Sequence, residues 1–173
     1  MNLKTRIREI PDWPVKGVNF KDITTLLQDR KTFKYLIDEM VKPFKTTKIN
    51  KVVAIDSRGF LLGSPIAYKL GCGICLVRKQ GKLPSKTIIE TYQKEYGPDT
   101  IAMHTDTIRT GEKILMVDDL IATGGTMKAA IRLVEKLGGK VAGISFIIDL
   151  PFLGGSKKIK KYKLHWLVSY ESE

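Results

Sequence analysis

Apolar residues follow two different spacings along the chain. Short, almost wholly apolar runs are typical of strands buried on both faces of a parallel sheet, and they predict strands at 51–55, 74–77, 113–117 and 141–148. Longer segments carry apolar residues every three or four positions and predict helices at 29–44, 60–70 and 126–137. Because strands and helices alternate, we expect an α/β fold with a central, mostly parallel sheet flanked by helices.

Two segments depart from these spacings. Residues 1–28 combine turn residues and aromatics without either period, so we expect an ordered N-terminal cap. Residues 85–105 alternate weakly between apolar and polar positions, as a β-hairpin does, and would form a movable flap. The chain has 173 residues, 43% of them hydrophobic, without internal repeats or a flexible linker. We therefore predict one domain spanning 1–173.

Bulk charge and hydropathy leave the function open. The formal net charge is +12, and the densest basic cluster is 157–163. A basic chain suits nucleic-acid binding, although a solvated basic face is a simpler explanation and a positive field also attracts polyanionic substrates. No stretch approaches the length of a membrane span, and residues 1–6 lack the apolar region of a secretory signal. We expect a cytoplasmic protein that does not associate with membranes.

Cys72 and Cys75 form a Cys-x-x-Cys pair. One such pair supplies only half of a four-ligand zinc site. Cys75 also lies inside the apolar run 74–77. We therefore expect both cysteines to pack in the core.

The stretch 117–126, Val-Asp-Asp-Leu-Ile-Ala-Thr-Gly-Gly-Thr, follows an expected buried strand, at whose carboxyl end ligands collect. A turn with backbone N–H groups and hydroxyls, followed by a helix N-terminus, can bind one phosphate; its residues are Ala122, Thr123, Gly124, Gly125 and Thr126. The carboxylates of Asp118 and Asp119 suit the hydroxyls of a phosphorylated sugar, or a cation. The alternative is an ordinary turn with surface aspartates, but capping needs only one acid and one glycine.

This stretch matches the motif that binds phosphoribosyl pyrophosphate (PRPP) in type I phosphoribosyltransferases. Further blocks, in the family's order, make the chain resemble the adenine phosphoribosyltransferases; they are 11–23, 56–60, 78–84 and 95–97. The resemblance extends over about 6–149, continues weakly through 153–155, and implies the type I phosphoribosyltransferase fold. It further implies a homodimer and magnesium-dependent transfer of the phosphoribosyl group from PRPP to N9 of adenine, giving AMP and pyrophosphate in purine salvage.

The resemblance assigns basic residues to pyrophosphate. Arg58 would clamp this leaving group and stabilise the charge that develops on it. In similar enzymes the turn 56–58, which contains Arg58, often has a non-proline cis peptide bond. Arg78, Lys79 and Lys82 would neutralise the diphosphate of PRPP. The alternatives are a surface ion pair for Arg58 and a solvated loop for the lysines.

Asp118 and Asp119 are assigned to the ribose hydroxyls, where a carboxylate favours an oxocarbenium-like transition state. The sequence contains no compact cage of acidic residues or histidines. We therefore expect Mg²⁺ to be held mainly by PRPP oxygens and water. No role is assigned to His104 or His165.

For the base, the resemblance places Phe20 against one face of adenine and Leu120 near the other. Backbone groups of Val18, Asn19 and Lys21 would read the edge of the ring. Asn19 stands where the family pattern has an aliphatic residue, which puts the local packing in question. Ordinary core packing is the alternative for Phe20.

The flap supplies the remaining residues. Glu95 matches a flap carboxylate that takes or shares the purine proton as N9 becomes nucleophilic, and Tyr96 follows it. Closure of the flap would exclude water from the reacting centre. A surface position is the alternative for Glu95.

Two rival functions stay open. The same fold could act on hypoxanthine, guanine, xanthine or orotate, because the PRPP motif does not read the base. A regulator that senses PRPP could instead bind RNA or DNA through its lysines, although the chain shows no extra binding domain. We favour the enzyme, with adenine, PRPP, AMP and pyrophosphate as ligands and no nucleic-acid partner.

Overall fold

The computed structural model describes residues 1–94 and 97–172. Its largest sheet has seven strands in the order β11-β9-β7-β3-β4-β6-β5. Their bounds are β3 (Lys51–Ile55), β4 (Gly73–Lys79), β5 (Thr87–Lys94), β6 (Gly97–His104), β7 (Lys113–Val117), β9 (Lys140–Ser145) and β11 (Leu164–His165). The strands from β11 to β4 are parallel, whereas β6 is antiparallel to both β4 and β5. The expected mostly parallel sheet is confirmed, with an antiparallel hairpin at one edge.

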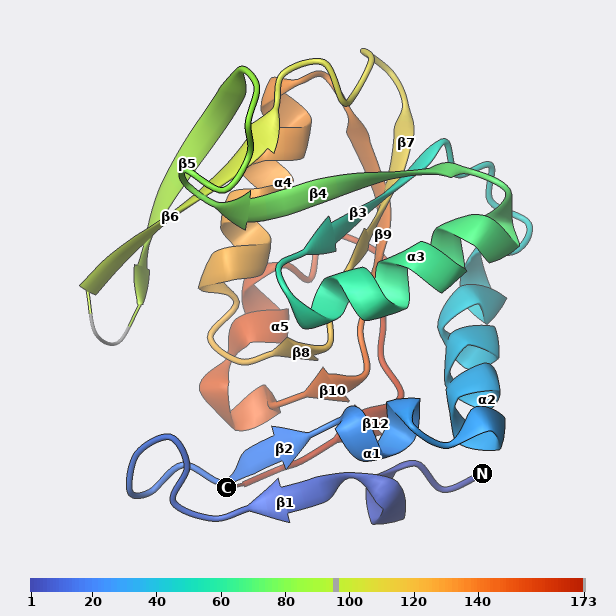
Figure 1. The fold of residues 1–173 in the computed structure, drawn as a ribbon, viewed down its shortest axis with the longest axis vertical. Coiled ribbons are helices and arrows are strands. Elements are labelled where there is room, and N and C mark those ends of the chain that lie inside the picture. The colour runs from blue at the N-terminus through green and yellow to red at the C-terminus, as the bar shows by residue number, and fades with distance from the viewer. Residues whose placement is uncertain (95–96, 173) are drawn as a thin grey trace.

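Helices cover both faces of this sheet. Figure 1 shows α3 (Arg58–Leu70) in front of the strands and α4 (Gly125–Lys136) behind them, with α2 (Arg30–Val41) beside α3. Side chains of a strand alternate between the two faces. In β3, Val52 packs in the core under α2 and α3, and Val53 packs in the core under α4. This double burial explains why the strand is apolar at successive positions.

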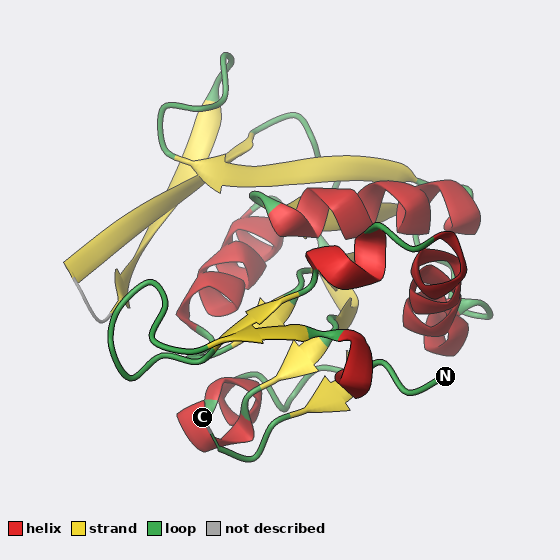
Figure 2. Cartoon of the chain, turned by 60° about the horizontal axis from the view of Figure 1, so that its bottom comes forward, coloured by secondary structure: helices red, strands yellow, loops and turns green. Residues whose placement is uncertain are grey.

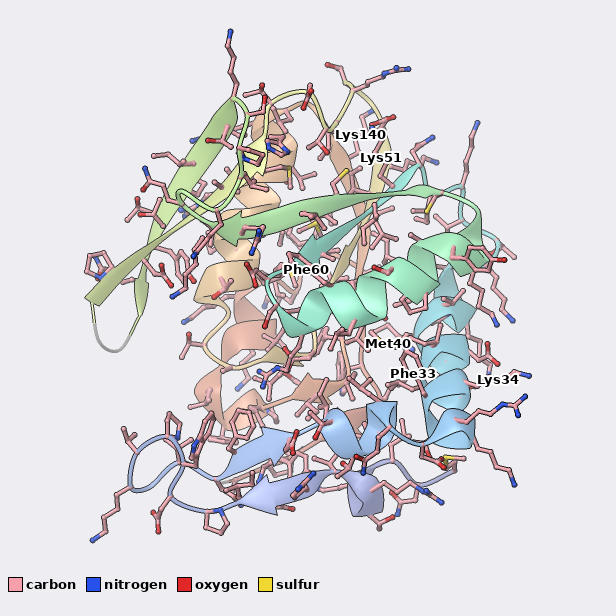
Figure 3. All side chains as sticks on the ribbon, viewed as in Figure 1. Phe33, Lys34, Met40, Lys51, Phe60 and Lys140 are labelled. Atoms are coloured by element: carbon pink, nitrogen blue, oxygen red, sulfur yellow. The ribbon has the colours of Figure 1, made fainter. Side chains whose placement is uncertain are left out.

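The helix α2 shows how helical spacing becomes packing. Figure 3 shows Phe33 and Met40 on the side of α2 that faces α3, and Lys34 on the opposite side. Met40 is fully buried, whereas Lys34 is exposed. Asp29 caps the helix, since its Oδ1 accepts a hydrogen bond of 2.8 Å from the N–H of Thr32. The periodic segment expected at 29–44 therefore forms α2 and a following 3-10 turn, Lys42–Phe44.

Two smaller sheets lie on one side of the molecule, as Figure 2 shows. One pairs β1 (Arg8–Ile10) antiparallel with β2 (Phe20–Asp22); the other joins three parallel strands, β8 (Leu120–Ile121), β10 (Ile148–Asp149) and β12 (Val168–Ser169). The remaining elements are α1 (Thr24–Leu27), α5 (Gly155–Lys158) and the 3-10 turns Lys4–Arg6 and Pro151–Leu153. The expected cap, 1–28, thus contains β1, β2 and α1.

The strand expected at 141–148 is wrong as a single element. Its first part is β9 in the large sheet, and Ile148 belongs to β10 in the small one. Between them the chain changes sheets, because the N–H groups of Ile147 and Ile148 both donate to the carbonyl of Asp119 at 3.0 Å. Both parts are buried, so the apolar run gives no sign of the break. The helix expected at 60–70 begins earlier, at Arg58.

Both cysteines are free thiols that pack with apolar neighbours. Cys75 is buried in the core under α4, and Cys72 packs against the core under α2 and α3. Burial raises the pKa of both thiols. The expected core packing is confirmed. In the described residues, no helix is both long and apolar enough to cross a membrane.

Candidate active site

A cleft of about 380 Å³ opens at the carboxyl ends of β3, β4 and β7. Figure 3 shows Phe60 near this end of β3, whereas Lys51 marks the other end of that strand. The hairpin β5–β6 borders the cleft because it joins the sheet at the carboxyl end of β4, where Arg78 pairs with Ala102. The cleft is lined by residues 55–58, 77–79 and 118–127, with Tyr92, Asp99 and Ile101 of the hairpin.

The ATGGT loop, Ala122–Thr126, lines one end of this cleft. Gly124 has φ +77°, a conformation that favours glycine, and α4 begins at Gly125. A Cβ on Gly125 would lie 3.0 Å from the ring of Tyr92, so the hairpin packs directly on the loop. The hydroxyl of Thr126 donates to Tyr92 Oη at 2.9 Å. The loop therefore presents a helix N-terminus to the cleft, as an anion site requires.

Asp118 and Asp119 lie between this loop and the basic end of the cleft. Desolvation, followed by the charge of Asp119, raises the pKa of Asp118 well above its ordinary value. Desolvation also raises the pKa of Asp119, and Arg58 opposes that rise. Asp119 Oδ2 lies 2.6 Å from Arg58 Nε; the contact is an ion pair without hydrogen-bond alignment, since this oxygen accepts no hydrogen bond within the described residues. The two acids thus meet a cation and face the cleft together.

Arg58 is positioned by the start of α3. In the turn before this helix, the peptide bond between Asp56 and Ser57 is cis, as the resemblance implies. Gly59 brings the helix against the end of β7, since a Cβ there would lie 3.0 Å from the carbonyl oxygen of Val117. The guanidinium of Arg58 also lies over the ring of Phe20, 5.2 Å from its centroid. One arginine therefore links the acids that follow β7 to the cap.

The second basic segment is held by acidic partners. Arg78 Nε donates to Asp56 Oδ2 at 2.9 Å, and another nitrogen of Arg78 donates to the carbonyl of Lys82 at 3.1 Å. Lys79 Nζ lies 4.0 Å from Asp99 Oδ2. Arg78 and Lys79 line the cleft, whereas Lys82 is exposed and contributes only its carbonyl to the support of Arg78.

Of the expected base-binding residues, Phe20 and Lys21 lie on β2, Val18 and Asn19 precede it, and Leu120 lines the cleft. Phe20 meets the ring of Trp13 edge-on, with centroids 4.4 Å apart. Asn19 Nδ2 donates to Glu9 Oε2 at 2.7 Å, so a polar partner replaces the packing expected of an aliphatic side chain.

Lys21 shares this carboxylate. Its side chain is 3% exposed, and Nζ lies 2.8 Å from Glu9 Oε2 and 4.3 Å from the ring centroid of Tyr170. The hydrogen bond from Lys21 is the main cause of the lowered pKa of Glu9. The cap is therefore fastened to the C-terminal part of the chain.

Glu95 and Tyr96 lie outside the described residues. The hairpin nevertheless brings in Tyr92, which the sequence reasoning missed. The sequence signal for Tyr92 is the two-residue period of β5. Ile88 and Tyr92 pack against the core under α4. Glu90, between them, forms ion pairs with Arg132 and Lys136 of α4. The three residues share the face of β5 that lies on α4.

Comparison with known proteins agrees with this geometry. The phosphoribosyl transferase domain family matches residues 23–170. The adenine phosphoribosyltransferase of Brachyspira hyodysenteriae is 56% identical over 170 residues, which cover 98% of this chain and all of that protein. The chain belongs to the adenine phosphoribosyltransferase family.

Solved structures of the adenine phosphoribosyltransferase family share this fold. The crystal structure of the Rhodothermus marinus protein has a TM-score of 0.93 and 47% identity, covering 97% of this chain and 96% of that one. The Saccharomyces cerevisiae protein, complexed with adenine and an imino-altritol bisphosphate, has a TM-score of 0.91 and 36% identity, with 96% of each chain covered. The type I phosphoribosyltransferase fold expected from the sequence is confirmed.

Proposed function

We propose that the protein transfers the phosphoribosyl group of PRPP to N9 of adenine and releases pyrophosphate, forming AMP. The observation that carries this proposal is the meeting, in one cleft, of the ATGGT loop, two aspartates and two arginines. Each suits one part of PRPP: the 5-phosphate, the ribose hydroxyls and the pyrophosphate. The yeast relative, complexed with adenine, supports the choice of base.

In the reaction, the bond between C1 of the ribose and pyrophosphate breaks, and a bond between C1 and N9 forms. Arg58 would stabilise negative charge on the departing pyrophosphate, with Arg78 and Lys79 beside it. Asp118 and Asp119 would accept hydrogen bonds from the ribose hydroxyls and stabilise positive charge on the sugar. The ATGGT loop would hold the 5-phosphate and thereby fix C1 relative to both groups.

The base would bind between the cap and Leu120. Phe20 is supported there by Trp13 and by the guanidinium of Arg58. Backbone groups of Val18, Asn19 and Lys21 would read the adenine edge. Because Glu9 holds the side chains of Asn19 and Lys21, the main chain between them is supported on both sides of Phe20.

Glu95 would accept the proton that leaves N9. We expect Glu95→Gln to lower kcat about 100-fold, because an amide cannot act as the base, while PRPP affinity stays within about twofold. Single-turnover kinetics and PRPP titration would separate the two effects. Glu112→Gln, at a carboxylate that pairs with Lys51, is the matched control. Unchanged turnover in Glu95→Gln would remove Glu95 from the mechanism.

Magnesium would enter with PRPP. Among the described residues, no group of three or more histidine, cysteine or acidic side chains could hold a metal ion. Asp119 and Asp56 line the cleft, but each already faces an arginine. This donor set fits an ion held mainly by PRPP oxygens and water, where it would neutralise the diphosphate. Chelation should abolish turnover, and added Mg²⁺ should restore it.

We also propose a homodimer in the cytoplasm. Apolar side chains stay uncovered on α3, at Leu61 and Tyr68, and on β4, at Ile74 and Leu76. Such a surface favours association with a second copy. Sedimentation analysis of the full chain would measure the assembly, and a monomer at all concentrations would contradict it.

The deciding experiment supplies PRPP and Mg²⁺ with adenine, hypoxanthine, guanine or orotate in separate reactions. We expect AMP and pyrophosphate in equal amounts from adenine alone. A different nucleotide would refute the base assignment while preserving the PRPP site. PRPP binding without turnover, together with salt-sensitive binding of RNA or DNA, would favour the regulator instead.

A further inference from the structure

The back of the ATGGT loop rests on α5, a segment that the proposed reaction does not use. A Cβ on Gly155 would overlap the carbonyl oxygen of Ala122 and lie 2.7 Å from the nitrogen of Gly124. A Cβ on Gly124 would in turn lie 2.8 Å from the carbonyl oxygen of Gly155. The two backbones are therefore in direct contact, with no side chain between them.

The segment α5 is itself anchored beside the loop. Ser156 Oγ donates to Asp149 Oδ2 at 3.1 Å, and both residues are buried. Asp149 belongs to β10, where it pairs with Ile121 of β8. The N–H of Leu150 donates to the carbonyl of Ile121 at 3.3 Å. The strand that leads into the loop and the helix that supports it are thus joined through β10.

Lys158 connects α5 to the loop by charge. It belongs to the basic cluster 157–163, yet its Nζ donates to the carbonyl of Thr123 at 2.9 Å. In a trans peptide the C=O and the N–H point in opposite directions. A hydrogen bond that draws the Thr123 carbonyl toward Lys158 therefore directs the N–H of Gly124 away from Lys158.

We propose that Lys158 is a positioning residue for the 5-phosphate of PRPP, an assignment that rests on the proposed function for the identity of that phosphate. Lys158 fixes the peptide between Thr123 and Gly124, so that the N–H of Gly124 is aligned before the phosphate arrives. Its ammonium also places a positive charge one peptide away from the anion. The residue acts through the loop and touches neither the ribose nor the base.

The test compares Lys158→Met with Lys157→Met, which removes the same charge from a neighbour on α5 that is exposed as Lys158 is. Ribose 5-phosphate binding is measured by calorimetry, and kcat and KM are measured with PRPP and adenine. We expect Lys158→Met to weaken ribose 5-phosphate binding and raise the KM for PRPP about tenfold, as for one lost hydrogen bond to a charged group. The KM for adenine, kcat and the melting temperature should stay close to wild type. Lys158→Arg should recover most of the affinity, and Lys157→Met should stay within about twofold of wild type.

If both methionine variants weakened ribose 5-phosphate binding equally, the cause would be the overall positive charge of α5, and the assignment would be overturned. An unchanged affinity in Lys158→Met would overturn it as well, as would a lowered melting temperature with kcat and both KM values changed alike. The two proposals can fail separately. The proposed function alone would be refuted if Lys158→Met weakened ribose 5-phosphate binding but the wild-type protein formed no AMP. The positioning role alone would be refuted if the protein formed AMP and Lys158→Met had the same KM for PRPP as wild type.

Discussion

The two ends of the cleft are built in different ways. At the ATGGT end the main chain is closely packed, because Gly124 lies against the backbone of Gly155 and Gly125 lies against the ring of Tyr92. At the basic end, long side chains pair with carboxylates, as in the pairs Arg58–Asp119 and Arg78–Asp56. One end is held by shape and the other by charge.

This difference indicates how each end meets its ligand. Packed backbone needs no rearrangement to present N–H groups to a phosphate. The arginines already pair with carboxylates, which hold the guanidinium groups in place without ligand. Pyrophosphate would have to bind the same guanidinium groups beside these carboxylates. Changes at the basic end should therefore act on charge stabilisation with the fold intact. Changes in the packed backbone at the loop end should alter affinity and stability together.

The largest expected effect is at the basic end. Arg58→Gln removes the cation between Asp119 and the leaving group and should lower kcat/KM by about 100-fold or more, as for a lost transition-state partner. Arg132→Gln, at an arginine that pairs with Glu90 away from the cleft, is the control and should stay within about twofold of wild type. Steady-state assays with PRPP and adenine measure both variants. Equal losses would contradict the role of Arg58.

An intermediate effect is expected at the loop end. Gly155→Ala would place a methyl group against the carbonyl of Ala122, so the loop must shift. We expect a KM for PRPP raised about tenfold and a free energy of unfolding lowered by about 1–3 kcal/mol. Denaturant unfolding and steady-state assays measure these changes.

Gly154→Ala is the matched control for that variant. Gly154 has φ +72°, but a Cβ there would meet nothing within 4 Å. Gly154→Ala should lower the free energy of unfolding by about 1 kcal/mol, because alanine disfavours a positive φ, and should leave the KM for PRPP unchanged. If both variants raise the KM alike, steric contact with the loop is not the cause.

The smallest effect concerns stability at the acids that separate the two ends. The pKa of Asp118 is raised, so the folded chain binds this proton more tightly than the unfolded chain does. The contribution of Asp118 is therefore most favourable below its ordinary pKa of 3.8 and is lost as pH rises through the raised value. Asp118→Asn removes that loss and should raise the melting temperature by a few degrees at about pH 8, with less gain near pH 4.

Thermal melts across that pH range would measure this difference. Asp106→Asn, at an exposed turn, is the control and should leave the melting temperature unchanged. A gain that does not depend on pH would show that the titration of Asp118 is not its cause.

The sequence predicts those helices and strands whose spacing of apolar residues is compatible with only one kind of packing. The uninterrupted apolar residues of β3 and β7 need burial on two faces, and the spacing in α2 needs one apolar face. The cluster of the ATGGT loop with Asp118 and Asp119 follows from chain order, since all lie at the end of one strand. Its meeting with Arg58 and Arg78 follows from parallel strands that end at the same edge.

The pairing of separate segments cannot be deduced in this way. The buried run that forms β9 and β10 has the same pattern whether it stays in one sheet or enters two. Lys158 belongs to the basic cluster 157–163, whose sequence is typical of a solvated face. Only in the folded chain does its ammonium lie beside Thr123. The partner of Asn19 is likewise a glutamate from a neighbouring strand, which spacing along the chain does not reveal.

The contact between Lys21 and Tyr170 sets the order in which the base-binding side can be completed during synthesis. The cap is made first, yet the ring over which Lys21 lies is made almost last. The strands β3, β4 and β7 and the ATGGT loop are synthesised well before Tyr170, so they can form while the first thirty or so residues still lack this support. A chain truncated before Tyr170 would therefore contain the residues of the phosphate site and an unfinished base pocket.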